Sequence, residues 1–165
     1  MQLHEAAAKL GEILIEREET LSVGEGSCGG LISAAFVGVA GASRFFVAGS
    51  VLYTRAAFRE ILGDDRYALR GLEGATADFS RAVAELVAKK FATTWAIAES
   101  GASGPTGNRY GHAAGHAALA VHGPVSRSRE IDTGRADRRE NMERFAIEAM
   151  ELLGEALYDA GEKRG

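Results

Sequence analysis

The sequence contains little cysteine, little proline and no long apolar run. Its 165 residues include one Cys and two Pro. One Cys cannot form an internal disulfide, which is typical of the reducing cytoplasm, and two Pro exclude proline-rich linkers. No apolar run reaches the roughly 18 residues needed to span a bilayer, and residues 1–5 lack the basic and apolar regions of a secretory signal. We therefore expect a soluble, cytoplasmic protein without a membrane partner.

The sequence also lacks an excess of positive charge. Its net charge is -4 and its pI is about 5.6, so nothing predicts binding to nucleic acid or to an anionic membrane. Charged residues make up 25% and hydrophobic residues 46%, which excludes disorder for most of the chain. A mass of 17.4 kDa is enough for one core and too little for two, so we expect a single domain over residues 1–165.

Glycine is abundant instead. The chain has 21 Gly, nearly twice the share expected from an average usage of about 7%. They follow no triplet period, which excludes collagen. Several gather in residues 24–30 and 101–107. Two places in the fold therefore require a close approach of the backbone.

Hydrophobic periodicity predicts strands that alternate with helices. The predicted helices are residues 3–18, 31–37, 54–62, 77–91 and 137–160, and the predicted strands are 20–23, 45–53, 93–98, 115–122 and 128–133. Residues 64–74 show no clear period. This order predicts an α/β fold, a three-layer α/β/α sandwich with a mostly parallel or mixed sheet. Ligands of such sheets bind beyond the carboxyl ends of strands, where both glycine clusters fall.

The first glycine cluster spells G-x-G-x-x-G with Gly24, Gly26 and Gly29. A dinucleotide site also needs an acidic residue at the end of the second strand, and residues 52–55 contain none, so an NAD site is disfavoured. Backbone N–H groups at a helix start can bind a phosphate or oxyanion instead. Ser27 and Cys28 lie beside these N–H groups. Ser27 is either a nucleophile or an N-cap, and Cys28 is either a reactive thiol or a small buried residue.

Two carboxylates and two further hydroxyls flank these loops. Glu25 and Glu99 each end a predicted strand, so they either face one another as base and hydrogen-bond acceptor or cap neighbouring helices. Ser100 and Ser103 belong to the second loop, which either surrounds a polar ligand or forms a tight connection.

Two other motifs suggest weaker possibilities. His112 and His116 have H-x-x-x-H spacing but lack the Glu of the zinc-protease signature, so we expect no metal site. Residues 137–140 open the last helix with a charged turn, which is either a solvated face or a place from which Arg138 reaches an anionic ligand.

Together, residues 21–35, 41–63 and 98–105 and the last helix resemble the CinA carboxy-terminal family, whose characterised members are nicotinamide-nucleotide amidases. The resemblance covers nearly the whole chain. Longer members carry a preceding molybdopterin-binding-like domain, and we expect this chain to be the stand-alone form.

Two catalytic positions of the family motifs are altered in this chain. The first family loop reads Glu-Ser-Cys-Thr-Gly-Gly with the Ser as proposed nucleophile, whereas here Gly26 takes the place of that Ser and Ser27 that of the Cys. The second motif is a Tyr followed five residues later by Lys. Tyr53 matches, but the Lys position is Phe58, and Arg59 is the nearest cation.

The other two motifs are better kept. The family's Thr-Gly-x-Ala-Gly-Pro corresponds to residues 100–105, where Ser100 retains a hydroxyl. The Asp-Arg pair that opens the family's last helix matches Asp137 and Arg138.

The resemblance implies an amidohydrolase that converts nicotinamide mononucleotide to nicotinate mononucleotide and ammonia, in a homo-oligomer without metal or cofactor. In this scheme Ser27 is the nucleophile because it is next to the position of the family's serine. Tyr53 contacts the substrate, and Ser100 orients the Ser27 hydroxyl. We expect Gly29 and Gly30 to line the oxyanion or phosphate site and Arg138 to bind the phosphate. The full set of expected substrate-binding residues is Glu25, Gly29, Gly30, Arg59, Ser103 and Arg138.

Because Gly26 and Phe58 replace the family's nucleophile and cation, a non-catalytic protein that binds a small phosphorylated ligand is the alternative. An amidase for a different small amide is a third possibility.

Overall fold

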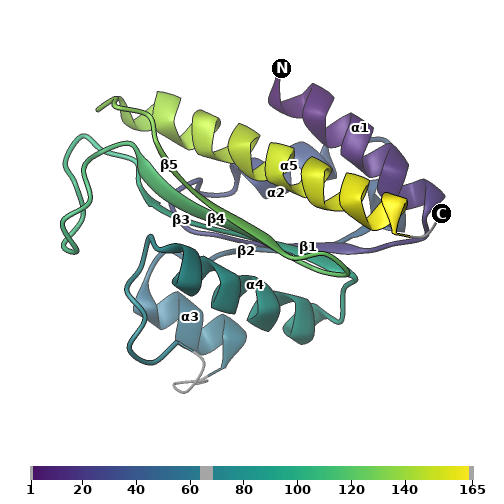
Figure 1. The fold of residues 1–165 in the computed structure, drawn as a ribbon, viewed down its shortest axis with the longest axis horizontal. Coiled ribbons are helices and arrows are strands. Elements are labelled where there is room, and N and C mark those ends of the chain that lie inside the picture. Colours follow the sequence, from purple (N-terminus) through teal and green to yellow (C-terminus); the bar gives the residue numbers. More distant parts are fainter. Residues whose placement is uncertain (1, 64–68, 164–165) are drawn as a thin grey trace.

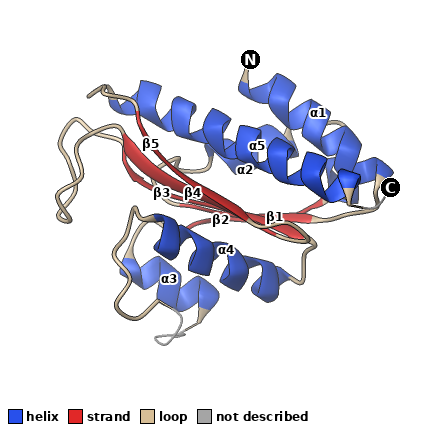
Figure 2. Ribbon diagram, viewed as in Figure 1, coloured by secondary structure: helices blue, strands red, loops and turns tan. Residues whose placement is uncertain are grey.

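The computed structural model describes residues 2–63 and 69–163, which form a sheet between two layers of helices (Figures 1 and 2). The strands are β1 (Leu21–Glu25), β2 (Phe46–Val51), β3 (Trp95–Ala102), β4 (His116–His122) and β5 (Arg127–Asp132). The helices are α1 (Leu3–Glu16), α2 (Leu31–Val37), the 3₁₀ turn η1 (Ala42–Arg44), α3 (Arg55–Leu62), α4 (Ala77–Phe91) and α5 (Arg138–Glu162). Residues 64–68, part of the stretch without a clear period, lie outside the described residues.

The sheet is mixed, with the strand order β2-β1-β3-β4-β5. Strand β1 pairs in parallel with β2 and β3, and β4 pairs antiparallel with β3 and β5. Helices α1, α2 and α5 cover one face, and α3 and α4 cover the other (Figure 2). The predicted three-layer α/β/α sandwich is confirmed.

The two faces of β3 carry side chains of different size. Trp95 and Ile97 belong to the core beneath α1, α2 and α5, whereas Ala96 and Ala98 belong to the core beneath α4. Because side chains alternate along a strand, this pattern gives one face bulky packing and the other room for close approach. Gly24 extends that room on β1: a Cβ there would lie 2.7 Å from Val87 Cγ2 of α4.

Side-chain caps mark the starts of three helices. Thr54 accepts a hydrogen bond from Ala57 N, Thr76 from Phe79 N and Asp137 from Glu140 N. A side-chain oxygen at this position pairs a backbone N–H that the helix leaves free. These caps explain why α3, α4 and α5 begin within one residue of the predicted starts.

The largest difference from the sequence prediction is at β3. The predicted strand ends at residue 98, but the observed strand continues through residue 102. Residues 99–102 pair with β4, with Gly101 opposite Ala117. Gly101 and Ala102 are small enough to allow this pairing, so the first two residues of the second glycine cluster are strand.

None of the helices within residues 2–63 and 69–163 has the length and apolar character that a bilayer crossing requires.

Candidate active site

The site is built on the turn between β1 and α2. Ser27, the second residue after β1, donates a short hydrogen bond from its hydroxyl to Glu99 Oε1 on β3. Ser27 is 6% exposed and Glu99 is 3% exposed. The Ser27 hydroxyl is therefore not the N-cap of α2, a position that Gly30 holds. It is paired with a buried carboxyl group.

Backbone donors hold the other oxygen of Glu99. Gly26 N and Cys28 N lie 3.0 and 2.8 Å from Glu99 Oε2. These bonds fix the carboxyl group and leave Oε1 to Ser27. Burial raises the pKa of Glu99 above its usual value, while the hydrogen bonds from Ser27 and Cys28 oppose this shift. When ionised, Glu99 is thus a stronger base than an exposed glutamate.

Glu25 has a different role, although it is the register partner of Glu99 on the adjacent strand. Its carboxylate accepts hydrogen bonds from Ile32 N at 3.0 Å and Ser33 N at 2.9 Å, and also from the Ser33 hydroxyl. Of the two interpretations left open by the sequence, helix capping applies to Glu25, and the role of hydrogen-bond acceptor applies to Glu99.

Gly101 makes room for the Ser27 hydroxyl. A Cβ at Gly101 would lie 2.9 Å from Ser27 Oγ and 2.8 Å from His116 O. Real Cβ atoms essentially never approach so closely. A side chain at residue 101 would therefore displace either Ser27 or β4.

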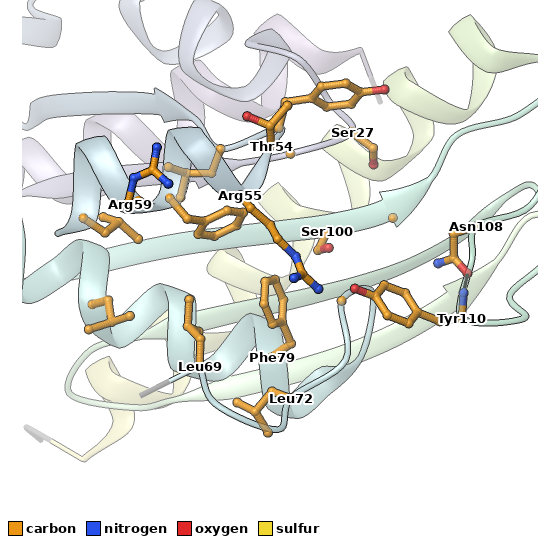
Figure 3. A pocket seen from close by; sticks show the side chains of 18 of the residues that line it. Ser27, Thr54, Arg55, Arg59, Leu69, Leu72, Phe79, Ser100, Asn108 and Tyr110 are labelled. Atoms are coloured by element: carbon orange, nitrogen blue, oxygen red, sulfur yellow. Dashed lines mark hydrogen bonds between the residues drawn. The ribbon is translucent and has the colours of Figure 1, made fainter. Parts of the chain in front are cut away.

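Ser27 opens into a cleft of about 740 Å³ (Figure 3). Of the predicted site residues, the structure brings Ser27, Tyr53, Arg59 and Ser100 to its wall. Ser100 Oγ accepts a hydrogen bond from Ala75 N at 3.0 Å, so the partner that orients the Ser27 hydroxyl is Glu99. The described residues that line the cleft are Gly26, Ser27, Leu52, Tyr53, Thr54, Arg55, Phe58, Arg59, Leu62, Gly63, Leu69, Arg70, Gly71, Leu72, Gly74, Phe79, Leu86, Ser100, Gly101, Asn108, Arg109 and Tyr110.

The remaining predicted residues lie outside that wall. Gly29 N donates to Gly26 O at 3.1 Å, and Gly29 and Gly30 have φ values of 64° and 107°, so they shape the turn. Ser103 is buried, and its hydroxyl has no hydrogen-bond partner among the described residues. Gly29, Gly30 and Ser103 are not among the residues that line the cleft.

Arg138 is close to the cleft without lining it. Its guanidinium donates to Gly104 O at 2.6 Å and to the Tyr53 hydroxyl at 3.1 Å. Tyr53 is 63% exposed. Arg138 therefore connects the start of α5 to the cleft rim through Tyr53.

Cys28 is a buried apolar residue in this structure. It is 0% exposed and belongs to the core beneath α1, α2 and α5. Burial, followed by the charges of Glu99 and Glu25, raises the pKa of its thiol well above the usual value. Its placement favours the second of the two interpretations that the sequence allowed.

The two histidines of the H-x-x-x-H motif stack on each other, with ring centroids 4.1 Å apart. His116 Nδ1 lies 2.9 Å from Asp132 Oδ1, and its Nε2 lies 2.9 Å from Ala75 O. Within residues 2–63 and 69–163, no group of three or more His, Cys, Asp or Glu residues is placed to hold a metal ion.

Sequence reasoning missed several polar residues of the cleft, among them Arg55, Arg109 and Tyr110. Arg55 opens α3, two residues after Tyr53, and the other two lie in the connection between β3 and β4. The H-x-x-x-H motif begins in that connection at His112, but it indicated neither Arg109 nor Tyr110 as a site residue. For Arg55 a signal was available, because it is a cation two residues after Tyr53.

Known proteins resemble the chain both in sequence and in fold. A CinA-like protein of Prochlorococcus marinus is 30% identical over 136 residues, which are 82% of this chain and 32% of that protein. One from Anaeromyxobacter dehalogenans is 33% identical over 145 residues, which are 87% of this chain and 35% of that protein. The chain thus spans about a third of the length of the curated relatives it matches.

Solved structures show the same fold over nearly the whole chain. A CinA superfamily protein from Klebsiella pneumoniae has a TM-score of 0.88 at 24% identity, with 96% of this chain and 99% of that chain covered. A competence/damage-inducible protein from Agrobacterium tumefaciens has a TM-score of 0.85 at 25% identity, with coverage of 94% and 95%. The family model of the CinA C-terminal domain matches residues 3–157. The chain therefore belongs to the CinA C-terminal domain family.

Proposed function

We propose that the protein is an amidohydrolase of a nicotinamide-nucleotide-like carboxamide, with Ser27 as nucleophile and Glu99 as general base. The observation that carries this proposal is the hydrogen bond from the Ser27 hydroxyl to the buried Glu99 carboxyl group at the wall of the cleft. A nucleophile within hydrogen-bond reach of a base is the arrangement that covalent catalysis requires. The nucleotide substrate is suggested by family membership and by the resemblance to nicotinamide-nucleotide amidases.

The proposed reaction uses Glu99 twice. Ser27 Oγ attacks the carboxamide carbon while its proton passes to Glu99, and collapse of the tetrahedral intermediate expels ammonia, which takes that proton. Water then attacks the acyl-serine with Glu99 as base, which releases the carboxylate product and restores the Ser27 hydroxyl. The raised pKa of Glu99 suits both proton transfers because a catalytic pKa nearer the working pH is more efficient.

Ammonia release from nicotinamide mononucleotide by the purified protein tests this proposal. We expect Ser27→Ala to abolish turnover and Glu99→Gln to lower it about 100- to 10,000-fold. Ser33→Ala is the matched control, because its hydroxyl contacts Glu25 instead. Undiminished turnover in Ser27→Ala would remove Ser27 from the mechanism.

A second candidate function is binding without hydrolysis, and the burial of Glu99 favours it. A carboxyl group whose pKa is raised by burial loses its capacity as a base below that pKa. This candidate predicts nucleotide binding by calorimetry with no ammonia release at any pH, whereas the hydrolase predicts a rate that rises as Glu99 ionises.

The substitutions Gly26→Ser and Phe58→Lys separate the two candidates further. A Cβ at Gly26 would lie 3.3 Å from Glu99 O and 3.5 Å from Leu52 O, so a serine fits if these neighbours shift by a few tenths of an ångström. Activity that appears only in this double variant would favour the binding protein. Activity already present in the wild-type chain would favour the Ser27 mechanism.

A further inference from the structure

The wall of the cleft is positively charged, although the chain carries a net charge of -4. Arg55, Arg59, Arg70 and Arg109 line it, and none of the lining residues that the structure describes is acidic. Such a concentration of one charge attracts a ligand of the opposite sign. The cleft therefore favours an anionic ligand.

Two of these arginines converge on one hydroxyl group. Arg109 Nη2 donates to the Tyr110 hydroxyl at 2.7 Å, and Arg109 Cζ lies 4.9 Å from the centre of the Tyr110 ring. Arg55 extends from the start of α3 toward the same hydroxyl (Figure 3). Hydrogen bonds and positive charge from Arg109 and Arg55 lower the pKa of Tyr110, although its partial burial opposes the shift. The two guanidinium groups thus create a strongly positive local potential.

The guanidinium groups of Arg55 and Arg109 have N–H donors left over that an anion could accept. Each guanidinium has five N–H donors, whereas the tyrosine oxygen is a single small acceptor without a formal charge. The two like charges repel each other, and a phosphate group would relieve that repulsion and accept several N–H bonds. Arg59 differs because its guanidinium is already paired with Glu60 Oε1 at 2.9 Å.

The apolar part of the cleft complements this charge. Phe58 and Phe79 meet edge to face with ring centroids 5.6 Å apart, and both line the cleft. Arg55 and Phe58 are three residues apart on α3 and therefore share one face of the helix. A ligand that carries a planar ring and an anionic group can thus contact aromatic carbon and guanidinium at the same time.

We propose that Arg55, Arg109 and the Tyr110 hydroxyl form the subsite for the phosphate group of the nucleotide. This inference rests on the proposed function and deepens it, since it names the residues that distinguish a nucleotide from a nucleoside. It replaces Arg138 in the role expected from the sequence, because Arg138 does not line the cleft and its guanidinium already donates to Gly104 O and to the Tyr53 hydroxyl.

The test compares nicotinamide mononucleotide with nicotinamide riboside, which lacks the phosphate, by calorimetry. In the double variant Arg55→Gln/Arg109→Gln we expect affinity for the mononucleotide to fall about 10- to 100-fold and affinity for the riboside to stay unchanged. Arg44→Gln is the matched control, because it removes one exposed positive charge outside the cleft. Equal losses for both ligands, or no loss, would overturn the subsite.

Inorganic phosphate separates this inference from the proposed function. We expect phosphate to raise the melting temperature of the wild-type protein and not that of the double variant, because a ligand that binds the folded state stabilises it. No rise in the wild type would overturn the subsite. Phosphate binding without ammonia release would support the subsite and contradict the hydrolase. Ammonia release with an unchanged KM in the double variant would support the hydrolase and contradict the subsite.

Tyr110 supplies an independent readout. The double variant should raise the pKa of Tyr110, which is measured by ultraviolet titration against Tyr110→Phe as a blank. An unchanged Tyr110 titration would contradict the contact with the two arginines.

Discussion

Gly101→Ala tests whether the Ser27 hydroxyl depends on a missing side chain opposite it. The new Cβ would lie 2.8 Å from His116 O, 2.9 Å from Ala117 Cβ and 2.9 Å from Ser27 Oγ. His116 O and the Ala117 Cβ belong to the paired strand β4, so neither can turn away as a flexible side chain would. Residue 101 has no left-handed φ, so the expected cost is steric rather than a backbone strain.

Overpacking of this kind costs about 1–3 kcal/mol. For a domain of this length each kcal/mol lowers the melting temperature by about 2–4 °C. The hydroxyl of Ser27 is the most movable of the three neighbours, so we also expect the variant to lose its contact with Glu99 and most of its ammonia release. Thermal unfolding followed by circular dichroism and the ammonia assay measure the two effects.

Gly154→Ala is the matched control. Residue 154 lies inside α5, and a Cβ there meets Leu10 Cδ2 at an ordinary 3.5 Å. Alanine is favoured over glycine within a helix by about 1 kcal/mol, so this variant should be more stable than the wild type. If Gly101→Ala were as stable and active as Gly154→Ala, the close packing described for β3, β4 and Ser27 would be wrong.

Three further outcomes follow from burial and from family membership. A carboxyl group with a raised folded-state pKa, such as Glu99, stabilises the protein fully below its usual pKa and loses that contribution as the pH rises through the raised pKa. As the pH rises above the usual pKa of a glutamate, the free energy of urea unfolding should therefore fall less for Glu99→Gln than for the wild type, and parallel curves would contradict this. Cys28 should resist iodoacetamide in the native protein and react in urea, because burial raises the pKa of its thiol; rapid native alkylation would refute this. We also expect a homo-oligomer by sedimentation, and a single 17.4 kDa species would count against it.

The order of the elements could be predicted from the sequence because each is marked locally. The bounds of α2 and α4 coincide with those expected. The apolar period of α2 begins after a glycine turn and that of α4 after a Thr cap, and each period ends where the helix ends. The end of β3 could not be predicted in this way. Residues 99–102 are two polar and two small residues without a strand pattern of their own, and they are strand because β4 pairs with them. That pairing is a contact between two elements, which the residues of β3 do not indicate by themselves.

Most of the site residues that could be predicted lie where a motif follows a strand. Ser27, Tyr53 and Ser100 were found in this way and line one cleft, together with Arg59, which was expected as the cation nearest to the Lys position of the family. Arg109 and Tyr110 were not found, because the connection between β3 and β4 has no clear period and its H-x-x-x-H motif does not include them. Glu25 and Glu99 look alike in the sequence, each at the end of a strand. Their roles differ because the backbone N–H groups nearest to each carboxyl group belong to different segments, α2 for Glu25 and the turn at residues 26–28 for Glu99.

The absence of a serine at residue 26 is therefore less decisive for catalysis than the sequence suggests. The backbone at Gly26 is held to Glu99, which places the next side chain, Ser27, against the same carboxyl group. Gly101 leaves the space that this hydroxyl occupies. A hydroxyl is thus present at the cleft with a partner that can accept its proton. What separates a hydrolase from a binding protein at this site is whether Glu99, buried and beside Glu25, is ionised at the working pH. The pH dependence of ammonia release consequently decides more about the function of this chain than the identity of residue 26.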